Sequence, residues 1–263
     1  MANLTLDILL YGYPGSGKTL IATSVAKHLK LNSLSVKGPE LLNKYIGASE
    51  QGVRDSFEKA QSMRPCVLIF DEFDAIVPKR TSGSVSVTDR VVNQFLTYLD
   101  GVEDITGVYI MAITTRPDLI DPAVIRAGRI DQHMFCGLPT SQDRKEFFQN
   151  RLKLINCEGG CLNDEFIDTL VGSTEGFSYA NLAGYLRNLQ VIFFDKLSKI
   201  TEGATISADE ASRLTTKDFT DCLPNCSVFA ESPEYTKLKK IYEEFSLKGM
   251  VAPDKPGTQQ ILH

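Results

Sequence analysis

The feature that most constrains this chain is the loop Gly12-Tyr13-Pro14-Gly15-Ser16-Gly17-Lys18-Thr19, which follows the apolar run Ile8-Leu9-Leu10-Tyr11. The glycines of the loop let backbone N–H groups approach an anion closely, because no side chain stands in the way. We expect Lys18 to reach the outer phosphates of a nucleotide and the Thr19 hydroxyl to bind Mg²⁺. The helical pattern from Leu20 to Ala26 would turn its positive dipole end toward the same anion. The order strand, loop, helix therefore predicts a phosphate-binding site. The residues assigned to nucleotide binding here are Pro14, Gly15, Ser16, Gly17, Lys18, Thr19 and Leu20.

A second constellation follows about fifty residues later, where the apolar run Cys66 to Phe70 ends in Asp71 and Glu72. A continuous apolar run is typical of a strand that is buried on both faces. At its carboxyl end, Asp71 is placed to hold Mg²⁺ and Glu72 to polarise an attacking water as a general base. The alternative is a solvated acidic turn, which the loop upstream makes the weaker interpretation.

The third element is another apolar run, Val108 to Ile113, which is followed by Thr115, our candidate to contact the water or the terminal phosphate. Beyond it, Arg126 and Arg129 lie three residues apart, a spacing that would place both guanidinium groups on one face of a short helix. Such a pair suits two arginine fingers that act on a neighbouring subunit. Taken alone, the pair would instead be interpreted as surface salt-bridge partners.

The apolar runs predict an α/β fold, a doubly wound parallel sheet of the P-loop NTPase type over residues 1–139. Residues 140–247 show only helical periodicity and are expected to form a small all-α lid. Residues 248–263 are expected to be a disordered tail, and residues 82–86 a flexible loop.

Composition narrows the function classes. The chain has 263 residues with a net charge of −5, which argues against a nucleic-acid-binding surface because phosphate neutralisation needs a basic excess. Its six cysteines lie in apolar or helical contexts with no signal peptide, so we interpret them as reduced thiols of a cytosolic protein. Their spacing is unlike that of a zinc site, and the chain has only three histidines. No apolar run approaches the length of a membrane span.

The set of motifs resembles the AAA+ ATPase module of the type II group over nearly the whole chain. Val36 to Glu50 is similar to the segment that carries the central pore loop, Asp71 to Ile76 to the extended Walker B box, and Gly176 to Leu182 to the lid motif beside the nucleotide base. The resemblance implies ATP and Mg²⁺ as cofactors, a hexameric ring, and nucleotide contacts from Tyr179 and Ala180. It also implies that Lys44, Tyr45 and Ile46 form a loop that grips a protein substrate in the pore.

Within this group the chain resembles the peroxisomal branch, on the stretches 37–50, 87–96 and 116–122 and on Thr115, where most of the group has Asn. That resemblance implies a motor in a heterohexamer with peroxisome biogenesis factor six, which extracts ubiquitinated import receptors. The location implied is the cytoplasm, with peripheral association to the peroxisomal membrane. The chain departs from the group at Tyr13, usually Pro, at Asn181, usually Asp, and at Tyr179, usually a small residue.

Two alternatives to a peroxisomal motor remain open. One is a nucleotide-stabilised structural subunit of a ring, and the other is a type II segregase or fusion-complex disassembling ATPase. Because the phosphate-binding loop begins at residue 12, we also expect the module to be truncated at its N-terminus.

Overall fold

The structure, a computed structural model, describes residues 7–41, 48–80, 87–103, 105–201 and 213–247. The chain divides into two compact units. An α/β unit holds the residues up to Tyr13, Gly17–Cys136 and the chain from Lys237, and a helical unit holds Pro14–Ser16 and Gly137–Thr236. The tail 248–263 and the loop 82–86, for which the sequence predicts disorder and flexibility, lie outside the described residues.

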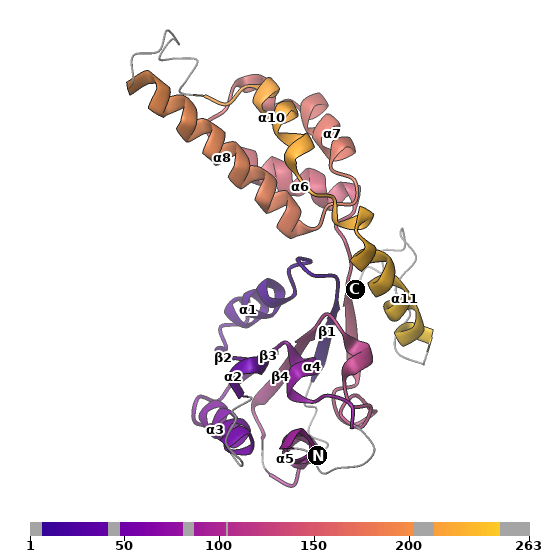
Figure 1. The fold of residues 1–263 in the computed structure, drawn as a ribbon. Helices are drawn as coiled ribbons and strands as arrows, with labels where there is room; N and C mark the ends of the chain where they lie inside the picture. The colour runs from indigo at the N-terminus through magenta and orange to yellow at the C-terminus, as the bar shows by residue number, and fades with distance from the viewer. Residues whose placement is uncertain (1–6, 42–47, 81–86, 104, 202–212, 248–263) are drawn as a thin grey trace, which may run out of the picture. The chain divides into compact units, whose positions relative to one another are not determined.

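The α/β unit is built on a five-stranded parallel sheet in the order β2-β3-β4-β1-β5 (Figure 1). The apolar runs 8–11, 66–70 and 108–113 each form a strand, and the α/β fold class is confirmed. The strands are β1 (Ile8–Gly12), β2 (Asn32–Lys37), β3 (Cys66–Asp71), β4 (Val108–Thr114) and β5 (Gln132–Cys136). The helices of this unit are α1 (Lys18–His28), α2 (Gly38–Leu41), α3 (Ala48–Ser62), α4 (Phe73–Ile76) and α5 (Val87–Leu99).

Alternating side chains of the strands bury apolar surface on both faces of the sheet. On one face, Ile8 and Leu10 of β1 pack with Ala22 and Ala26 of α1 in a core shared with β3 and β4. The small side chains of α1 fit this place because they let the helix approach the strands closely. A second core joins Phe57 of α3, Phe95 and Tyr98 of α5, and Phe70 and Phe73, all at most 1% exposed. The doubly wound arrangement therefore buries β1, β3 and β4 and leaves their carboxyl ends to carry polar residues.

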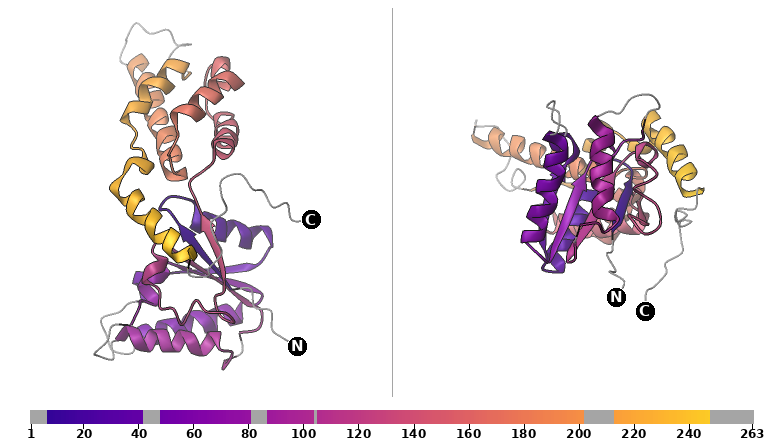
Figure 2. Two further views of the ribbon diagram at one scale, coloured as in Figure 1. Left: turned by 90° about the vertical axis from the view of Figure 1, so that its right-hand side faces the viewer. Right: turned by 90° about the horizontal axis from the view of Figure 1, so that it is seen from below.

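The C-terminal helix α11 (Pro233–Leu247) differs from the expectation of a helical lid that extends to residue 247. From Lys237 onward it belongs to the α/β unit, because Tyr242 and Phe245 pack their rings against Tyr11 of β1. Figure 2 shows this yellow half of α11 running beside the strands of the unit. Helical periodicity predicts the helix but not the partner of its apolar face.

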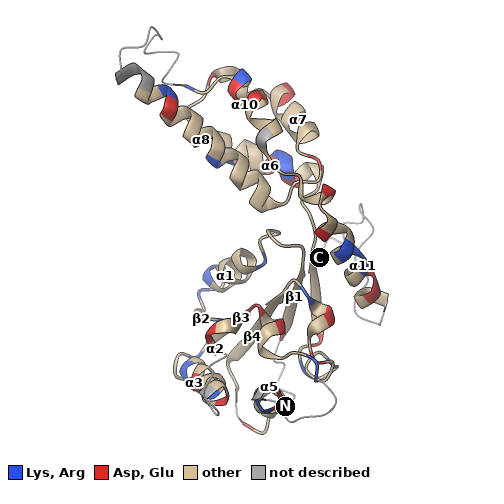
Figure 3. Ribbon diagram, in the orientation of Figure 1, with Lys and Arg blue, Asp and Glu red and all other residues tan. Residues whose placement is uncertain are grey.

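The helical unit contains α6 (Ser141–Leu152), α7 (Asp164–Ser173), α8 (Tyr179–Thr201) and α10 (Thr216–Cys222). Two of these helices begin with a capping box, formed by Thr140 with Asp143 and by Thr215 with Asp218. The core of the helical unit includes Phe148, Tyr185 and Phe219, each fully buried. Acidic and basic residues are interspersed on the helices of both units (Figure 3).

The six cysteines are free thiols in the structure, and burial raises the pKa of Cys161 to about 12 and that of Cys222 to about 11. Among the described residues, no cluster of three or more His, Cys, Asp or Glu side chains has an arrangement that could hold a metal ion. Nor does any described helix combine the length and apolarity needed to cross a membrane.

Candidate active site

Glu72 and Thr115, two of the predicted catalytic residues, lie where β1, β4 and β3, three adjacent strands, reach their carboxyl ends. In an open α/β sheet this edge is where ligands bind. Gly12 ends β1 and leads into the phosphate-binding loop, Asp71 ends β3, and Thr115 directly follows β4. The sheet order, which the sequence alone does not reveal, thus brings three distant motifs to one edge.

Gly12, at the end of β1, and Gly17, in the loop that follows, are required for different reasons. Gly12 has φ +147°, and a Cβ there would lie 2.0 Å from the carbonyl oxygen of Cys136 on β5. Gly17 is the N-cap of α1 in the left-handed region, φ 88° and ψ 13°, where its carbonyl accepts the first helical hydrogen bond from Ile21 N at 2.8 Å. Space around the Gly17 Cα is open, so its backbone conformation, rather than crowding, favours glycine.

Lys18 is 7% exposed, and its ammonium group lies against the start of the loop. Nζ donates to the carbonyl oxygens of Gly12 at 3.0 Å and Tyr13 at 2.7 Å. Burial lowers the pKa of Lys18 to about 8, while the nearby Cys136 and Asp71 act in the opposite direction. A cation is therefore held at the loop with little water around it, which strengthens its attraction for phosphate oxygens.

Thr19 and Asp71 meet, although 52 positions separate them in the sequence. The Thr19 hydroxyl donates to Asp71 Oδ2 at 2.8 Å, and the other carboxylate oxygen, Oδ1, accepts from Glu72 N at 3.0 Å. A hydroxyl and a carboxylate side by side form the oxygen donor set that Mg²⁺ prefers. The residues present thus fit the predicted metal ligands Thr19 and Asp71.

Glu72 occupies an unusual backbone position. It is a non-glycine residue in the left-handed region, φ 53° and ψ 49°, at the start of α4. Its side chain is exposed, and no hydrogen bond or ion pair engages its carboxylate among the described residues. Backbone strain of this kind costs of order 1 kcal/mol and clusters at functional sites. The turn it produces lets two consecutive carboxylates leave the same strand end.

The two threonines at the end of β4 differ in their surroundings. Thr114 is 2% exposed, and its hydroxyl donates to Asp74 Oδ1 at 2.5 Å and accepts from Arg116 N at 2.9 Å. Thr115, the predicted sensor, is half-buried, and its carbonyl oxygen accepts a hydrogen bond from Tyr242 Oη at 2.9 Å. The hydroxyl of Thr114 is thus committed to the protein, which is consistent with Thr115 as the candidate for the ligand.

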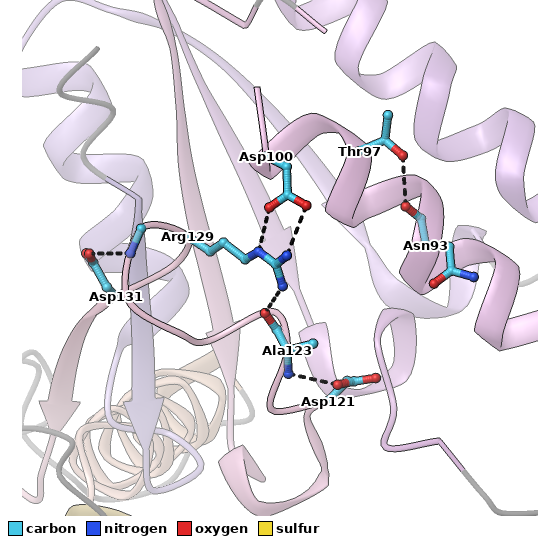
Figure 4. Close-up of polar contacts among 8 residues, drawn as sticks. Asn93, Thr97, Asp100, Asp121, Ala123, Arg129 and Asp131 are labelled. Atoms are coloured by element: carbon cyan, nitrogen blue, oxygen red, sulfur yellow. Dashed lines mark hydrogen bonds and ion pairs between the residues drawn. The ribbon is translucent and has the colours of Figure 1, made fainter. Parts of the chain in front are cut away.

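The two candidate arginine fingers do not lie on a helix, so the expectation of a short helix is wrong. Residues 121–130 form turns and bends, and Gly128, with φ +82°, interrupts helical backbone between the two arginines. Arg126 is exposed, whereas Arg129 pairs with Asp100 through two bonds, Nε to Oδ1 at 2.7 Å and Nη2 to Oδ2 at 2.9 Å (Figure 4). Arg129 Nη1 also donates to the carbonyl oxygen of Ala123. The side chain of Arg129 is therefore oriented by its own subunit.

In the helical unit, the lid motif begins α8. Asn181 Oδ1 accepts from Ser178 N at 3.0 Å and from Ser178 Oγ at 2.8 Å, while Asn181 N donates back to Ser178 Oγ at 3.2 Å. A carboxylate oxygen would accept the same two bonds, so Asn replaces the usual Asp without loss of the cap. The Tyr179 ring lies 6.4 Å from that of Phe147, with a tilt of 59°.

Ala180 contacts the phosphate-binding loop within the same unit. Its N–H donates to the carbonyl oxygen of Gly15 at 3.1 Å, and a Cβ on Gly15 would lie 2.6 Å from the Cβ of Ala180. Gly15 is therefore required by close approach to the lid motif as well as by its φ of +72°. This contact brings two predicted nucleotide-binding residues, Gly15 and Ala180, together.

The predicted pore-loop residues Lys44, Tyr45 and Ile46 lie outside the described residues.

Sequence reasoning missed the part that Tyr13 and Tyr242 play beside this site. Tyr13, noted only as a departure from the family, is 6% exposed, and its ring lies 5.0 Å from that of Tyr242 and 5.9 Å from that of Phe135. An aromatic residue inside a glycine-rich loop is the one signal in the sequence that an apolar partner must cover it.

Comparison with known proteins finds that the chain is similar to a family of ATPases. Residues 8–138 match the model of the ATPase family associated with various cellular activities (AAA). The chain is 42% identical to peroxisomal ATPase pex1 of Schizosaccharomyces pombe over 251 residues, which is 95% of this chain and 26% of that protein. It is 51% identical to PEX1 of Saccharomyces cerevisiae and 50% identical to PEX1 of Homo sapiens, in each case over 70% of this chain. The chain spans 26%, 18% and 14% of the length of these three relatives.

Proposed function

Because the chain belongs to the AAA family of ATPases, we propose that it is the ATP-hydrolysing module of a protein-remodelling ring, corresponding to the second ATPase domain of peroxisome biogenesis factor one. The observation that carries the chemistry is the 2.8 Å contact between Thr19 Oγ1 and Asp71 Oδ2. It joins the phosphate-binding loop to the acidic strand end, so that one ligand would touch both motifs.

Each residue of the site has a separate task in this proposal. Lys18 and the backbone of the loop bind the phosphates, and Thr19 and Asp71 would hold Mg²⁺, which neutralises phosphate charge when bound. Glu72 accepts the proton of the attacking water, and Thr115 orients that water or the terminal phosphate.

Arg126 and Arg129 act on the nucleotide of the neighbouring subunit, where a guanidinium stabilises the charge that develops on the transferred phosphoryl group. The exposed position of Arg126 leaves its guanidinium accessible to another subunit. The bidentate pair with Asp100 fixes the geometry of Arg129.

The cellular task follows from the relatives. The three relatives compared above are all named peroxisomal ATPases, and the identities of 42–51% cover 70–95% of this chain. We assign the chain to a heterohexamer with peroxisome biogenesis factor six, at the cytoplasmic face of the peroxisomal membrane. There it extracts ubiquitinated import receptors, and Tyr45 grips the unfolded receptor as a rigid aromatic side chain.

The experiment is to assemble the ring with its partner ATPase and to follow ATP hydrolysis and extraction of a ubiquitinated receptor together. Tyr45→Ala should leave hydrolysis within about twofold, because the side chain takes no part in phosphate chemistry, and should abolish extraction. Normal extraction by the Tyr45→Ala ring would contradict the threading role.

A second candidate function is a nucleotide-stabilised structural subunit, and one contact favours it. Arg129 uses three of its five N–H donors on Asp100 and Ala123 of its own chain, which leaves only two for a neighbour's phosphate. ATP turnover separates the candidates, because a structural subunit binds ATP without hydrolysing it.

A further inference from the structure

We propose that Tyr242 of α11 is a positioning residue of the ATP site, which holds the sensor end of β4 and the phosphate-binding loop in place at the same time. The proposal rests on the proposed function, because the reaction that Tyr242 assists is ATP hydrolysis. Tyr242 is 127 positions from its hydrogen-bond partner in the sequence, outside every motif considered above.

The hydroxyl of Tyr242 fixes the sensor strand. Tyr242 is 2% exposed, and Oη donates to the carbonyl oxygen of Thr115 at 2.9 Å. Because the peptide unit is planar, an anchored carbonyl restricts the backbone torsion that follows the Thr115 Cα. The bond thus limits the directions that the Thr115 hydroxyl can take toward a ligand.

The ring of Tyr242 supports the loop. It meets the ring of Tyr13 edge to face, with centroids 5.0 Å apart and planes at 76°, and it also contacts Phe135 at 5.5 Å. The carbonyl oxygen of Tyr13 accepts a hydrogen bond from Lys18 Nζ at 2.7 Å. The residue that Tyr242 covers therefore also holds the phosphate-binding lysine.

These two contacts make Tyr242 a link between binding and chemistry. One side chain contacts a residue of the phosphate-binding loop with its ring and the sensor residue with its hydroxyl. The helix that carries it begins at Pro233 in the helical unit and continues from Lys237 in the α/β unit. Loss of the hydroxyl should disturb the backbone at Thr115, whereas loss of the ring should also disturb Tyr13 and Lys18.

The chain offers a matched control. Tyr11 belongs to the same aromatic cluster, with its ring 5.9 Å from that of Tyr242, and is fully buried. Its hydroxyl has no hydrogen-bond partner among the described residues. Tyr11→Phe thus deletes a buried hydroxyl from the same cluster without removing a bond, and such a change is neutral or stabilising.

The experiment measures ATP affinity of the 263-residue chain by calorimetry and kcat of ATP hydrolysis in the ring assembled with the partner ATPase. Tyr242→Phe should lower kcat about fivefold, the effect of one hydrogen bond, with ATP affinity within about twofold of wild type. Tyr242→Leu, which also removes the ring, should in addition weaken ATP binding by about tenfold. Tyr11→Phe should leave both quantities within about twofold.

Unchanged kcat in Tyr242→Phe would overturn the proposal, and so would an equal fall in Tyr11→Phe, which would indicate general loosening of the cluster. If Tyr242→Leu does not fold, as judged by its circular dichroism, the comparison of the two Phe variants decides. A wild-type ring that does not hydrolyse ATP would refute the proposed function and this inference together. An active wild-type ring, inactivated by Glu72→Gln but unaffected by Tyr242→Phe, would refute the inference alone.

Discussion

The Thr19 hydroxyl donates a hydrogen bond to Asp71 Oδ2 at 2.8 Å, so the phosphate-binding loop directly contacts the acidic end of β3. Two oxygen ligands so placed can serve one cation that also touches phosphate. This arrangement follows from the sheet order, in which β4 alone separates β3 from β1.

Removal of the Thr19 hydroxyl should therefore weaken only the metal-dependent part of nucleotide binding. Thr19→Val should lower ATP affinity by about tenfold or more in Mg²⁺ and hardly at all in EDTA. Thr23→Val is the matched control, since the Thr23 hydroxyl lies one turn further along α1 and donates to the carbonyl oxygens of Thr19 and Leu20. Titration with a fluorescent ATP analogue measures both variants. Equal losses with and without Mg²⁺ would show that Thr19 is no metal ligand.

The lowered pKa of Lys18 predicts a pH dependence of ATP binding. Burial lowers this pKa to about 8, and bound phosphate, which favours the ammonium form, must raise it again. Affinity should thus be flat just below pH 8 and fall as pH rises above it, by up to about tenfold per unit, with a proton taken up on binding. ATP itself is already fully ionised in this range.

Calorimetry in two buffers of different ionisation enthalpy measures the proton directly. Lys18→Arg is the control, because arginine stays charged throughout and should bind without proton uptake. Binding of ATP at pH 9 with no proton uptake by the wild-type chain would contradict the assignment of Lys18 to the phosphates.

Substitutions of Arg126 and Arg129 should differ in their effect on the stability of the isolated chain. Arg129→Ala should lower the free energy of unfolding by about 0.5–1 kcal/mol, because it removes a partly exposed bidentate pair with Asp100, and Arg126→Ala should leave the melting temperature unchanged. In the assembled ring either change should reduce ATP turnover, by about a thousandfold for a full arginine finger. ATP binding by the monomer should survive both. Loss of monomer binding would instead indicate a local structural role.

Asp7, which directly precedes β1, should make stability depend on pH. It is 3% exposed, and burial raises its pKa from 3.8 to about 6, although Oδ1 accepts from Ile110 N at 3.1 Å. Well below pH 3.8 both folded and unfolded states hold the proton, so there is no penalty. As pH rises from 4 to 6 the unfolded state ionises first, and stability falls by up to about 3 kcal/mol.

Asp7→Asn keeps an acceptor for Ile110 N and removes the titration. It should stabilise the chain at pH 7 and change little at pH 4, as measured by urea unfolding at both values. A difference between variant and wild type that is the same at the two pH values would contradict the burial of the charge.

The strands and the motifs at their ends were predictable because their signals are local. A strand buried on both faces must be continuously apolar, as in residues 66–70, and a loop that approaches phosphate must be rich in glycine. The acids and the loop could be assigned to one site because parallel strands bring their carboxyl ends to one edge.

The features of the fold and the site that the sequence did not predict depend on contacts between distant residues, which no local pattern contains. The helix over 233–247 is periodic, yet nothing in that segment shows that Tyr242 lies against Tyr13 and Thr115. The prediction of a helix around Arg126 was wrong because a local pattern was misleading. A spacing of three suits a helix, but Gly128 at positive φ lies between the two arginines and the segment forms turns instead.

The most direct test of the central claim is the replacement of Glu72 by Gln, which keeps the shape of the side chain at the strained turn after β3 and removes the base. ATP affinity of the chain should stay within about twofold of wild type, while turnover in the assembled ring should fall by about two orders of magnitude or more. Turnover equal to that of the wild-type ring would contradict the account, because Glu72 would then take no part in the reaction that the site is proposed to perform.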